Sequence, residues 1–312
     1  MNIQDLKYII EVERSGSINR AADNLFMAQS NLSRSVKEIE KELGITIFKR
    51  NPKGIVVTEQ GAIFLNHAKA ILAELTNIEN IGKAAEHRML SFNISIPRAS
   101  YITYAFTEFV KQIDCSEGIC MSFKETNAEE AIDKIVEREN NLGIIRYQNT
   151  YEEYFISLLE EKDIRYQTIW EFEYLVLMSK EHPLAQYEEI PYHSLGEYVE
   201  VVNGDNSVPQ FSVSHLRMDK VDNEKKSICI YDRGSQFDLL SRVHTTYMWV
   251  SPMPQEMLDQ YGLVQRKCNI SYKINKDVLI YLNNYKLTDL DKKFILELNM
   301  VQANMAKIYE VQ

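Results

Sequence analysis

The sequence predicts an α/β protein with an N-terminal all-α winged helix-turn-helix, a long linker helix and a larger α/β region. Two short amphipathic helical patterns joined by a tight turn precede Gly44, and a basic Gly-containing loop follows them. A helical pattern without proline continues to about residue 89, and strand-like and helix-like stretches alternate after it. We therefore expect a winged helix-turn-helix at residues 1–58, a linker helix at 59–89 and an α/β region at 90–312.

The composition is that of a folded chain, with 45% hydrophobic and 26% charged residues among 312. No apolar run is long enough for a membrane span, and the N-terminus reads as a helix instead of a signal peptide. The spacing of Cys115, Cys120, Cys229 and Cys268 fits no metal motif or disulfide framework. A reducing cytoplasm and buried cysteines are therefore the simple expectation, and a redox switch at Cys115 and Cys120 is the alternative.

The charge is distributed unevenly, although the net charge of −10 is unusual for a DNA-binding protein. Residues 28–58 contain six basic and three acidic side chains, whereas the acidic excess lies after residue 88. A positive surface confined to the head would attract the DNA backbone while the acidic remainder repels it.

The predicted third helix, from about Gln29 to Leu43, has the features of a DNA-reading helix. Leu32, Val36, Ile39 and Leu43 form one apolar stripe. Gln and Arg side chains on the other face can pair with base edges, and Ser, Lys and Arg can contact phosphates. We expect base contacts from Gln29, Ser33 and Arg34. We expect phosphate contacts from Ser30, Lys37, Arg50 and Lys53, the last two in a β-hairpin wing. A merely solvated polar face is the alternative.

The head resembles that of the LysR-type transcriptional regulators over residues 1–61. The residues that carry the resemblance match in type and spacing: Ala21, Ala22, Leu25, Gln29, Leu32, Ser33, Arg34, Glu40, Leu43, Gly44, Phe48, Arg50, Thr58, Glu59 and Gly61. Three positions depart from the family pattern, namely Ala28, Ser30 and Asn31. Because the usual N-cap hydroxyl and first-turn proline are missing there, the base preference is expected to differ.

The linker helix needs a packing partner, since a lone helix of this length is poorly stable. Its apolar stripe is Leu65, Ala68, Leu72, Leu75 and Ile78. Packing on the protein's own body is one possibility. The resemblance implies instead that the stripe pairs with a second copy, giving a homodimer or homotetramer.

The region after residue 90 predicts a parallel sheet, because its first three strands alternate with helices. The expected strands are 92–96, 119–124, 142–146, 169–178, 227–231, 247–251, 263–266 and 277–282, and the expected helices are 101–113, 129–137 and 287–307. The pattern resembles the family's two-lobed, periplasmic-binding-protein-like effector domain. That resemblance places one lobe at about 90–161 and 268–312 and the other at about 162–267.

A small-molecule effector, with an anion as one candidate, is expected at the carboxyl ends of the strands, between the lobes. The predicted effector-binding residues are Arg98, Ser100, Tyr101, Thr126, Asn127, Arg146, Asn203 and Gly204. Helix capping by Ser100 and Thr126, a surface salt bridge for Arg146 and a plain turn at Asn203-Gly204 are the alternatives.

No catalytic, cofactor or metal motif occurs in the sequence, so we predict a non-enzyme with no cofactor and no metal. The expected protein is a cytoplasmic transcription regulator that binds double-stranded DNA, with RNA polymerase as a further candidate partner and no membrane contact. Two alternatives stay open. One is an enzymatic α/β domain fused to a DNA-binding head, and the other is a regulator that responds to redox or to a protein partner instead of a small ligand.

Overall fold

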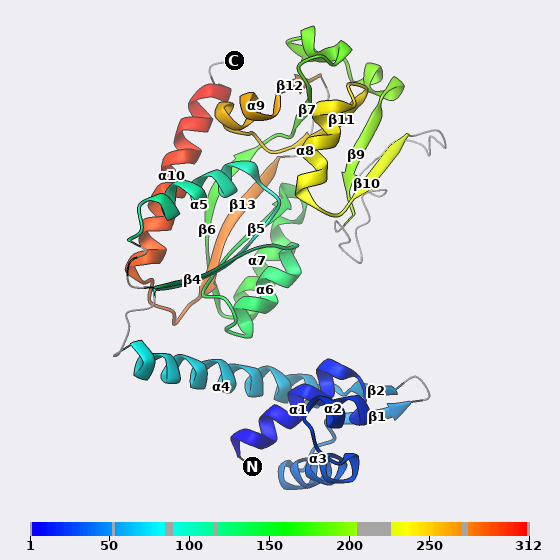
Figure 1. The fold of residues 1–312 in the computed structure, drawn as a ribbon, viewed down its shortest axis with the longest axis vertical. Helices are drawn as coiled ribbons and strands as arrows, with labels where there is room; N and C mark the ends of the chain where they lie inside the picture. Colours follow the sequence, from blue (N-terminus) through cyan, green and yellow to red (C-terminus); the bar gives the residue numbers. More distant parts are fainter. Residues whose placement is uncertain are drawn as a thin grey trace. The chain divides into compact units, whose positions relative to one another are not determined.

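The protein is described here by a computed structural model that covers residues 2–51, 54–84, 90–114, 116, 118–204, 226–269 and 274–310. The chain divides into two compact units, which are described separately (Figure 1). Most of the first unit is Met1–Ser91, and most of the second is Phe92–Ser116, Met121–Ile132 and Asn141–Gln312. Within the described residues, no helix combines the length and apolar content that a membrane span requires.

Three helices begin the first unit, namely α1 (Ile3–Ser15), α2 (Ile18–Asn24) and α3 (Gln29–Leu43). Asn2 and Asp5 form a capping box at the start of α1, and Gly16 ends it at φ 63°, a conformation that glycine adopts without strain. The start of α3 is different, because Ala28 has no side chain that can accept from the helix. The sequence-based prediction of a weak N-cap there is confirmed.

The core of the first unit comes from apolar side chains of all three helices, including the fully buried Ile9 and Leu32. The predicted stripe of α3 is confirmed at Leu32, Val36 and Ile39, but Leu43 is 37% exposed. Leu43 is the last helical residue, where the chain turns away from the core at Gly44. The buried stripe therefore holds the opposite face of α3 outward.

The predicted wing is an antiparallel hairpin of β1 (Phe48–Asn51) and β2 (Gly54–Val57). The Glu40 side chain of α3 accepts hydrogen bonds from the backbone of Ile47 (2.7 Å) and Phe48 (3.1 Å), which ties the hairpin to the helix. The linker helix α4 (Glu59–Ala84) follows. Thr58 caps it, accepting from the Gly61 backbone N–H at 2.9 Å.

The second unit contains two sheets. The five-stranded sheet has the order β4-β3-β5-β13-β6, and the six-stranded sheet has the order β10-β9-β11-β7-β12-β8. The strands of the first are β3 (Leu90–Ile96), β4 (Ile119–Glu125), β5 (Leu142–Gln148), β6 (Ile164–Phe172) and β13 (Asn275–Leu282). Those of the second are β7 (Leu175–Ser179), β8 (Glu189–Ile190), β9 (Val199–Asn203), β10 (Ser227–Ile230), β11 (Thr246–Val250) and β12 (Leu263–Cys268). We call the part of the chain around each sheet lobe 1 and lobe 2, respectively.

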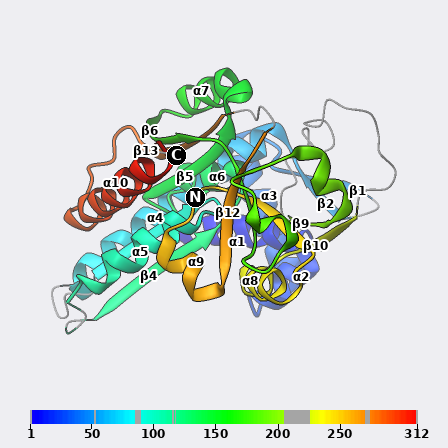
Figure 2. The ribbon, with the colours of Figure 1, turned by 90° about the horizontal axis from the view of Figure 1, so that it is seen from above.

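Helices cover both sheets. They are α5 (Ser100–Lys111), α6 (Ala128–Val136), α7 (Glu152–Glu161), α8 (Arg233–Arg242), α9 (Gln255–Tyr261) and α10 (Asp289–Glu310). The terminal helix α10 runs beside α5 (Figures 1 and 2), and the rings of Phe109 and Phe294 meet edge to face at 5.6 Å. Lobe 1 therefore closes its core with the last helix of the chain.

The sequence-based prediction for this unit is correct in its first part and differs from the structure in three details. Strands β3 and β5 are parallel, as the βαβαβ pattern predicts. The single strand expected at 169–178 is two strands, β6 and β7, which belong to different sheets. Because β6 pairs with β13 in lobe 1, the first crossover follows Phe172 and is not near residue 162. Helices α7, α8 and α9 were not expected.

Candidate nucleic-acid interface and inter-lobe site

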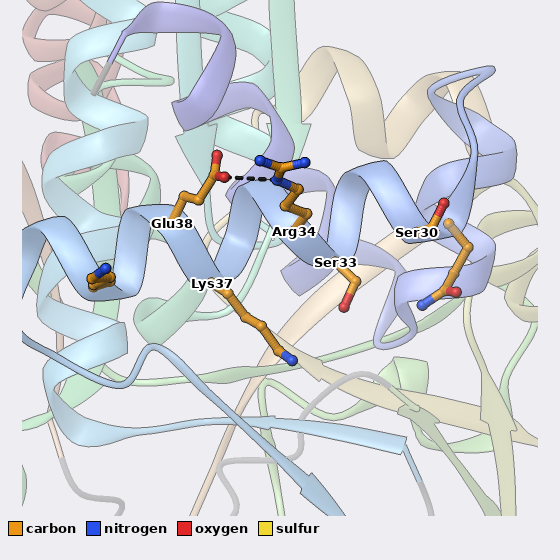
Figure 3. Close-up of a pocket in the computed structure, with 7 residues that line it drawn as sticks. Ser30, Ser33, Arg34, Lys37 and Glu38 are labelled. Atoms are coloured by element: carbon orange, nitrogen blue, oxygen red, sulfur yellow. Dashed lines mark hydrogen bonds and ion pairs between the residues drawn. The ribbon is translucent and has the colours of Figure 1, made fainter.

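The outward face of α3 is a shallow open groove of polar side chains. Its lining residues are Gln29, Ser30, Ser33, Arg34, Lys37, Glu38 and Lys41. Five of the predicted DNA-binding residues therefore lie on one surface. Figure 3 shows Ser33 and Lys37 extending from one side of the helix and Arg34 with Glu38 from the other.

Glu38 is a member of this surface that the sequence analysis did not select. Its Oε1 accepts from Arg34 Nε at 2.8 Å, one helical turn away, and both side chains are largely exposed. Such an exposed pair contributes only about 0.3–0.5 kcal/mol to stability. Its effect is therefore mainly on the direction of the Arg34 guanidinium. The spacing of four residues between these opposite charges could have predicted the pair from the sequence, because residues four apart are neighbours on a helix.

The wing contains Arg50 and Lys53, two of the residues predicted to contact phosphates. Strand β1 pairs Arg50 with Ile55 of β2, but the Arg50 side chain and the whole of Lys53 lie outside the described part of the chain. Gly54 is placed where a Cβ would lie 2.9 Å from the Gly16 carbonyl oxygen, so the hairpin needs glycine at this position. The start of β2 is thus fixed against the turn between α1 and α2, where the Ile55 backbone N–H also donates to the Gly16 carbonyl at 3.2 Å.

The predicted dimerisation stripe of α4 must be corrected. Leu65 and Ala68 are each 1% exposed, and Leu65 packs into the core of its own unit. Among the side chains of α4 that the structure describes, the large apolar ones that are exposed are Ile63, Ile71 and Ile78, at 58%, 48% and 58%. The spacings of eight and seven residues keep these three on one side of the helix. Of the predicted residues, Ile78 alone is strongly exposed.

The most extensive polar contacts in the second unit join its two lobes. Arg98, which follows β3 in lobe 1, donates from Nη1 to Asn203 Oδ1 at 2.9 Å and from Nη2 to the Tyr231 carbonyl at 2.5 Å. Both acceptors belong to lobe 2. Arg98 and Asn203 were predicted separately, and the fold brings them together.

A second arginine reaches in the opposite direction. Arg233 begins α8 in lobe 2, where Asp232 caps the helix by accepting from the Ser235 backbone N–H at 2.7 Å. The Arg233 guanidinium donates to Ser100 Oγ at 2.7 Å and to Thr103 Oγ1 at 3.0 Å, both on α5 of lobe 1. Burial lowers the pKa of Arg233, and the nearby Glu125 carboxylate opposes that effect.

Glu125, the last residue of β4, lies between the two arginines. Its Oε1 forms an ion pair with Arg233 Nη1, and its Oε2 is 4.0 Å from Arg98 Nε. The side chains of all three are about one-fifth exposed, at 22%, 19% and 18% for Glu125, Arg233 and Arg98. Neither Arg233 nor Glu125 was predicted. The capping pattern Asp232-Arg233-Gly-Ser235 after a strand was the signal that could have located Arg233.

Arg146, a predicted effector-binding residue, forms a buried ion pair, so the alternative of a surface salt bridge does not hold. Its Nε and Nη2 donate to the two oxygens of Asp277 at 2.7 and 2.6 Å, and Asp277 is fully buried. Its Nη1 donates to the Arg98 carbonyl at 3.2 Å. Burial alone would lower the pKa of Arg146, but the Asp277 carboxylate outweighs it and raises that pKa.

Three other predicted effector residues make contacts that stabilise the fold itself. Tyr101 is fully buried, so it is a core residue whose hydroxyl donates to Asp277 at 2.5 Å. Asn127 caps α6 by accepting from the Glu130 backbone N–H at 2.8 Å. A Cβ on Gly204 would lie 2.3 Å from the Tyr231 ring, so the ring packs directly on this glycine.

The buried Thr126 hydroxyl has no hydrogen-bond partner, although such groups are usually paired. The expectation of buried cysteines is wrong for Cys120 and Cys229, which are exposed, and Cys115 lies outside the described residues. Among the described residues, no group of three or more His, Cys, Asp or Glu side chains is placed to hold a metal ion.

Comparison with known sequences gives matches to the first part of the chain. The pattern of the family described as "Bacterial regulatory helix-turn-helix protein, lysR family" matches residues 3–62. The HTH-type transcriptional regulator BsdA of Bacillus subtilis is 45% identical over 73 residues, which is 23% of this chain and 25% of that protein. The regulator CrgA of Neisseria meningitidis is 38% identical over 90 residues, 29% of this chain and 28% of that protein. These alignments span only about a quarter of each relative.

Comparison with solved structures covers nearly the whole chain. A full-length OxyR variant from Pseudomonas aeruginosa matches with a TM-score of 0.56 and 16% identity, covering 98% of this chain and 96% of that one. Full-length CbnR in complex with its target DNA matches with a TM-score of 0.57 and 16% identity, covering 96% and 100%. At this identity the likeness concerns the fold, and it extends to both lobes.

Proposed function

We propose that this chain, whose residues 3–62 match the lysR family of bacterial regulatory helix-turn-helix proteins, regulates transcription by binding specific duplex DNA as a homo-oligomer. A small anionic effector between lobes 1 and 2 would control it. The observation that carries the proposal is the outward face of α3, where five side chains able to contact DNA share one groove. The proposal places the protein in the cytoplasm, with RNA polymerase as a candidate partner.

The proposed roles follow from the chemistry of each side chain. Gln29, Ser33 and Arg34 read base edges, since Gln suits adenine and Arg suits guanine O6 and N7. Ser30 and Lys37 contact phosphates, together with Arg50 and Lys53 of the wing. In the second unit, Arg98, Asn203 and Arg233 would contact the effector, and the unpaired Thr126 hydroxyl is a further candidate donor.

Replacing Arg34 with Ala is expected to weaken binding to the specific site by about 1–3 kcal/mol, because a bidentate base contact is lost. Binding to random duplex DNA should change little. Genomic fragments that co-purify with the protein supply the specific duplex, and fluorescence anisotropy at fixed salt measures both affinities. The measurement must hold salt constant because phosphate contacts depend on it.

Lys37→Ala is the matched control on the same helix face. Since Lys37 is assigned to phosphate, this variant should bind specific and random DNA less tightly by the same factor, with a salt slope reduced by about 1. An equal loss on both DNAs for the Arg34 variant would reassign Arg34 to the backbone.

Self-association is proposed through the exposed side of α4 that carries Ile63, Ile71 and Ile78. Two copies of this helix would cover the three isoleucines and present two heads for paired half-sites. This surface replaces the stripe predicted from the sequence, because Leu65 and Ala68 are already buried.

Replacing Ile71 with Asn is expected to raise the dimer dissociation constant about tenfold to a hundredfold, through loss of buried apolar surface. Sedimentation velocity across a concentration series measures it. Ala62→Asn is the control, because residue 62 is exposed and lies nine residues away, on the opposite side of the helix. If both variants dissociate alike, the interface lies elsewhere.

A further inference from the structure

Two arginines cross between the lobes in opposite directions and meet at one carboxylate. Arg98 extends from lobe 1 to lobe 2, Arg233 extends from lobe 2 to lobe 1, and Glu125 contacts both. We propose that Glu125 is an internal counter-ion that occupies the place of the anionic effector's charged group, and that the effector binds by displacing it. This inference rests on the proposed effector function of the same site.

The positions of the two arginines do not depend on Glu125 alone. Arg98 is held by the Asn203 amide oxygen and the Tyr231 carbonyl, and Arg233 by the hydroxyls of Ser100 and Thr103. All four partners are neutral. They orient the guanidinium groups without balancing their charge, and Glu125 is a charged side chain that contacts both of them.

Two other carboxylates near the cluster, Asp277 and Asp232, already have hydrogen-bond partners. Asp277 is engaged by two nitrogens of Arg146. Asp232 accepts from the Ser235 backbone at the start of α8, and this hydrogen bond is the main reason that its pKa is lowered, with a smaller contribution from Arg98. Both Arg98 and Arg146 repel the charge of Arg233. Removing the Glu125 charge therefore makes this partly buried site more positive.

The chemistry of the site defines the ligand class. A group that displaces Glu125 must offer at least two negatively charged oxygens, because it has to satisfy one guanidinium from each lobe. Carboxylate, sulfate and phosphate groups share this property. Glu125 belongs to lobe 1, so its ion pair with Arg233 connects the lobes directly. When a free ligand replaces the Glu125 carboxylate, the Glu125–Arg233 ion pair is lost and the ligand bridges the two lobes instead. Effector binding could shift the arrangement of the lobes in this way.

The test compares full-length protein with its Glu125→Gln variant, using inorganic sulfate as the probe. Thermal unfolding is followed in sodium sulfate and in sodium chloride of equal ionic strength. The variant should reach its half-maximal sulfate-dependent shift at about tenfold lower sulfate than the unmodified protein, because the competing charge-assisted contact is gone. Glu130→Gln is the matched control, since Glu130 pairs with the exposed Lys124 outside the cluster. It should respond like the unmodified protein.

Two further variants keep the outcome decisive. Arg233→Met added to Glu125→Gln should abolish the gain, and persistence of the gain in that double variant would overturn the proposal by placing the sulfate elsewhere. If Glu125→Gln does not fold, Glu125→Asp serves instead, because its shorter side chain keeps the charge but weakens the contact, and a smaller gain in the same direction is expected. An unchanged sulfate response in the folded variant would also overturn it.

Failure of this inference can be told apart from failure of the proposed function. A Glu125→Gln protein that retains specific DNA binding but shows no sulfate gain overturns the counter-ion and leaves the DNA function standing. An unmodified protein that binds no specific DNA overturns the proposed function, whatever its response to sulfate.

Discussion

Replacing Arg146 with Met is expected to lower the free energy of unfolding of the second unit by about 3–5 kcal/mol, because the variant leaves a buried carboxylate without its cation. Asp277 is fully buried, and its two oxygens accept from Arg146 at 2.7 and 2.6 Å. Only the Tyr101 hydroxyl, at 2.5 Å, would remain of the Asp277 partners named above. Methionine fills much of the same volume but supplies no charge.

Urea denaturation with a probe confined to the second unit measures this effect, since a chain of two units need not unfold in one transition. Trp170 in the core of lobe 1 supplies an intrinsic fluorescence signal there. Lys180→Met is the matched control, because Lys180 and Asp259 form an exposed ion pair at 2.7 Å. Such an exposed pair contributes little to stability, because solvent screens it. An Arg146 variant no less stable than this control would show that the Asp277 charge is relieved in another way.

Much of the head could be predicted from the sequence because its signals are local. The bounds of α3 follow from a heptad-like apolar stripe and a terminal glycine, both readable within fifteen residues. The sequence did not, however, identify what the next helix, α4, packs against. Leu65 and Ala68 form an apolar stripe whether they pack on their own head or on a second chain, and periodicity alone does not distinguish these cases.

The inter-lobe site could be predicted only in pieces. Arg98, Ser100 and Arg146 were selected because each lies at the end of a strand or at the start of a helix. Most of the partners named above are more than a hundred residues away in the sequence; the exceptions are Glu125 beside Arg98 and the Arg98 carbonyl, which is 48 residues from Arg146. Arg233 was missed because α8 buries only Gln236, Phe237 and Leu240, which gives a weak amphipathic pattern.

The prediction of one strand at 169–178 was wrong for a related physical reason. Apolar residues continue from β6 into β7 with little interruption, so the sequence shows one extended run. The chain leaves one sheet after Phe172 and enters the other at Leu175. Because a buried strand is apolar in either sheet, the pattern does not record which sheet it joins.

The second large effect is expected at Gly61, where two physical effects of the same substitution have opposite signs. Gly61 lies in the first turn of α4, and alanine is favoured over glycine within a helix by about 1 kcal/mol. A Cβ at this position, however, would lie 2.3 Å from the Ile47 carbonyl oxygen and 3.0 Å from two more backbone atoms of that residue. A backbone segment cannot move aside as a flexible side chain can.

The clash should prevail, because Ile47 is fully buried and its segment is held from two sides. Its carbonyl accepts from the Thr58 backbone N–H at 3.0 Å, and its own N–H donates to Glu40 at 2.7 Å. Moving α4 away would break the first contact and uncover Leu65. We therefore expect Gly61→Ala to destabilise the head by about 3 kcal/mol, at the upper end of the cost of overpacking.

The test of Gly61→Ala measures the stability of each unit of the chain separately. Hydrogen exchange should show faster exchange at Leu32 and Val36 of α3, whereas the amides of β13 in the second unit stay protected, and specific DNA binding should fall with the folded fraction of the head. Gly196→Ala is the control, since a Cβ at Gly196 meets nothing within 4 Å. If Gly61→Ala instead stabilises the head, helix propensity outweighs the contact with Ile47, and the close approach of α4 to the segment before β1 is not what requires glycine here.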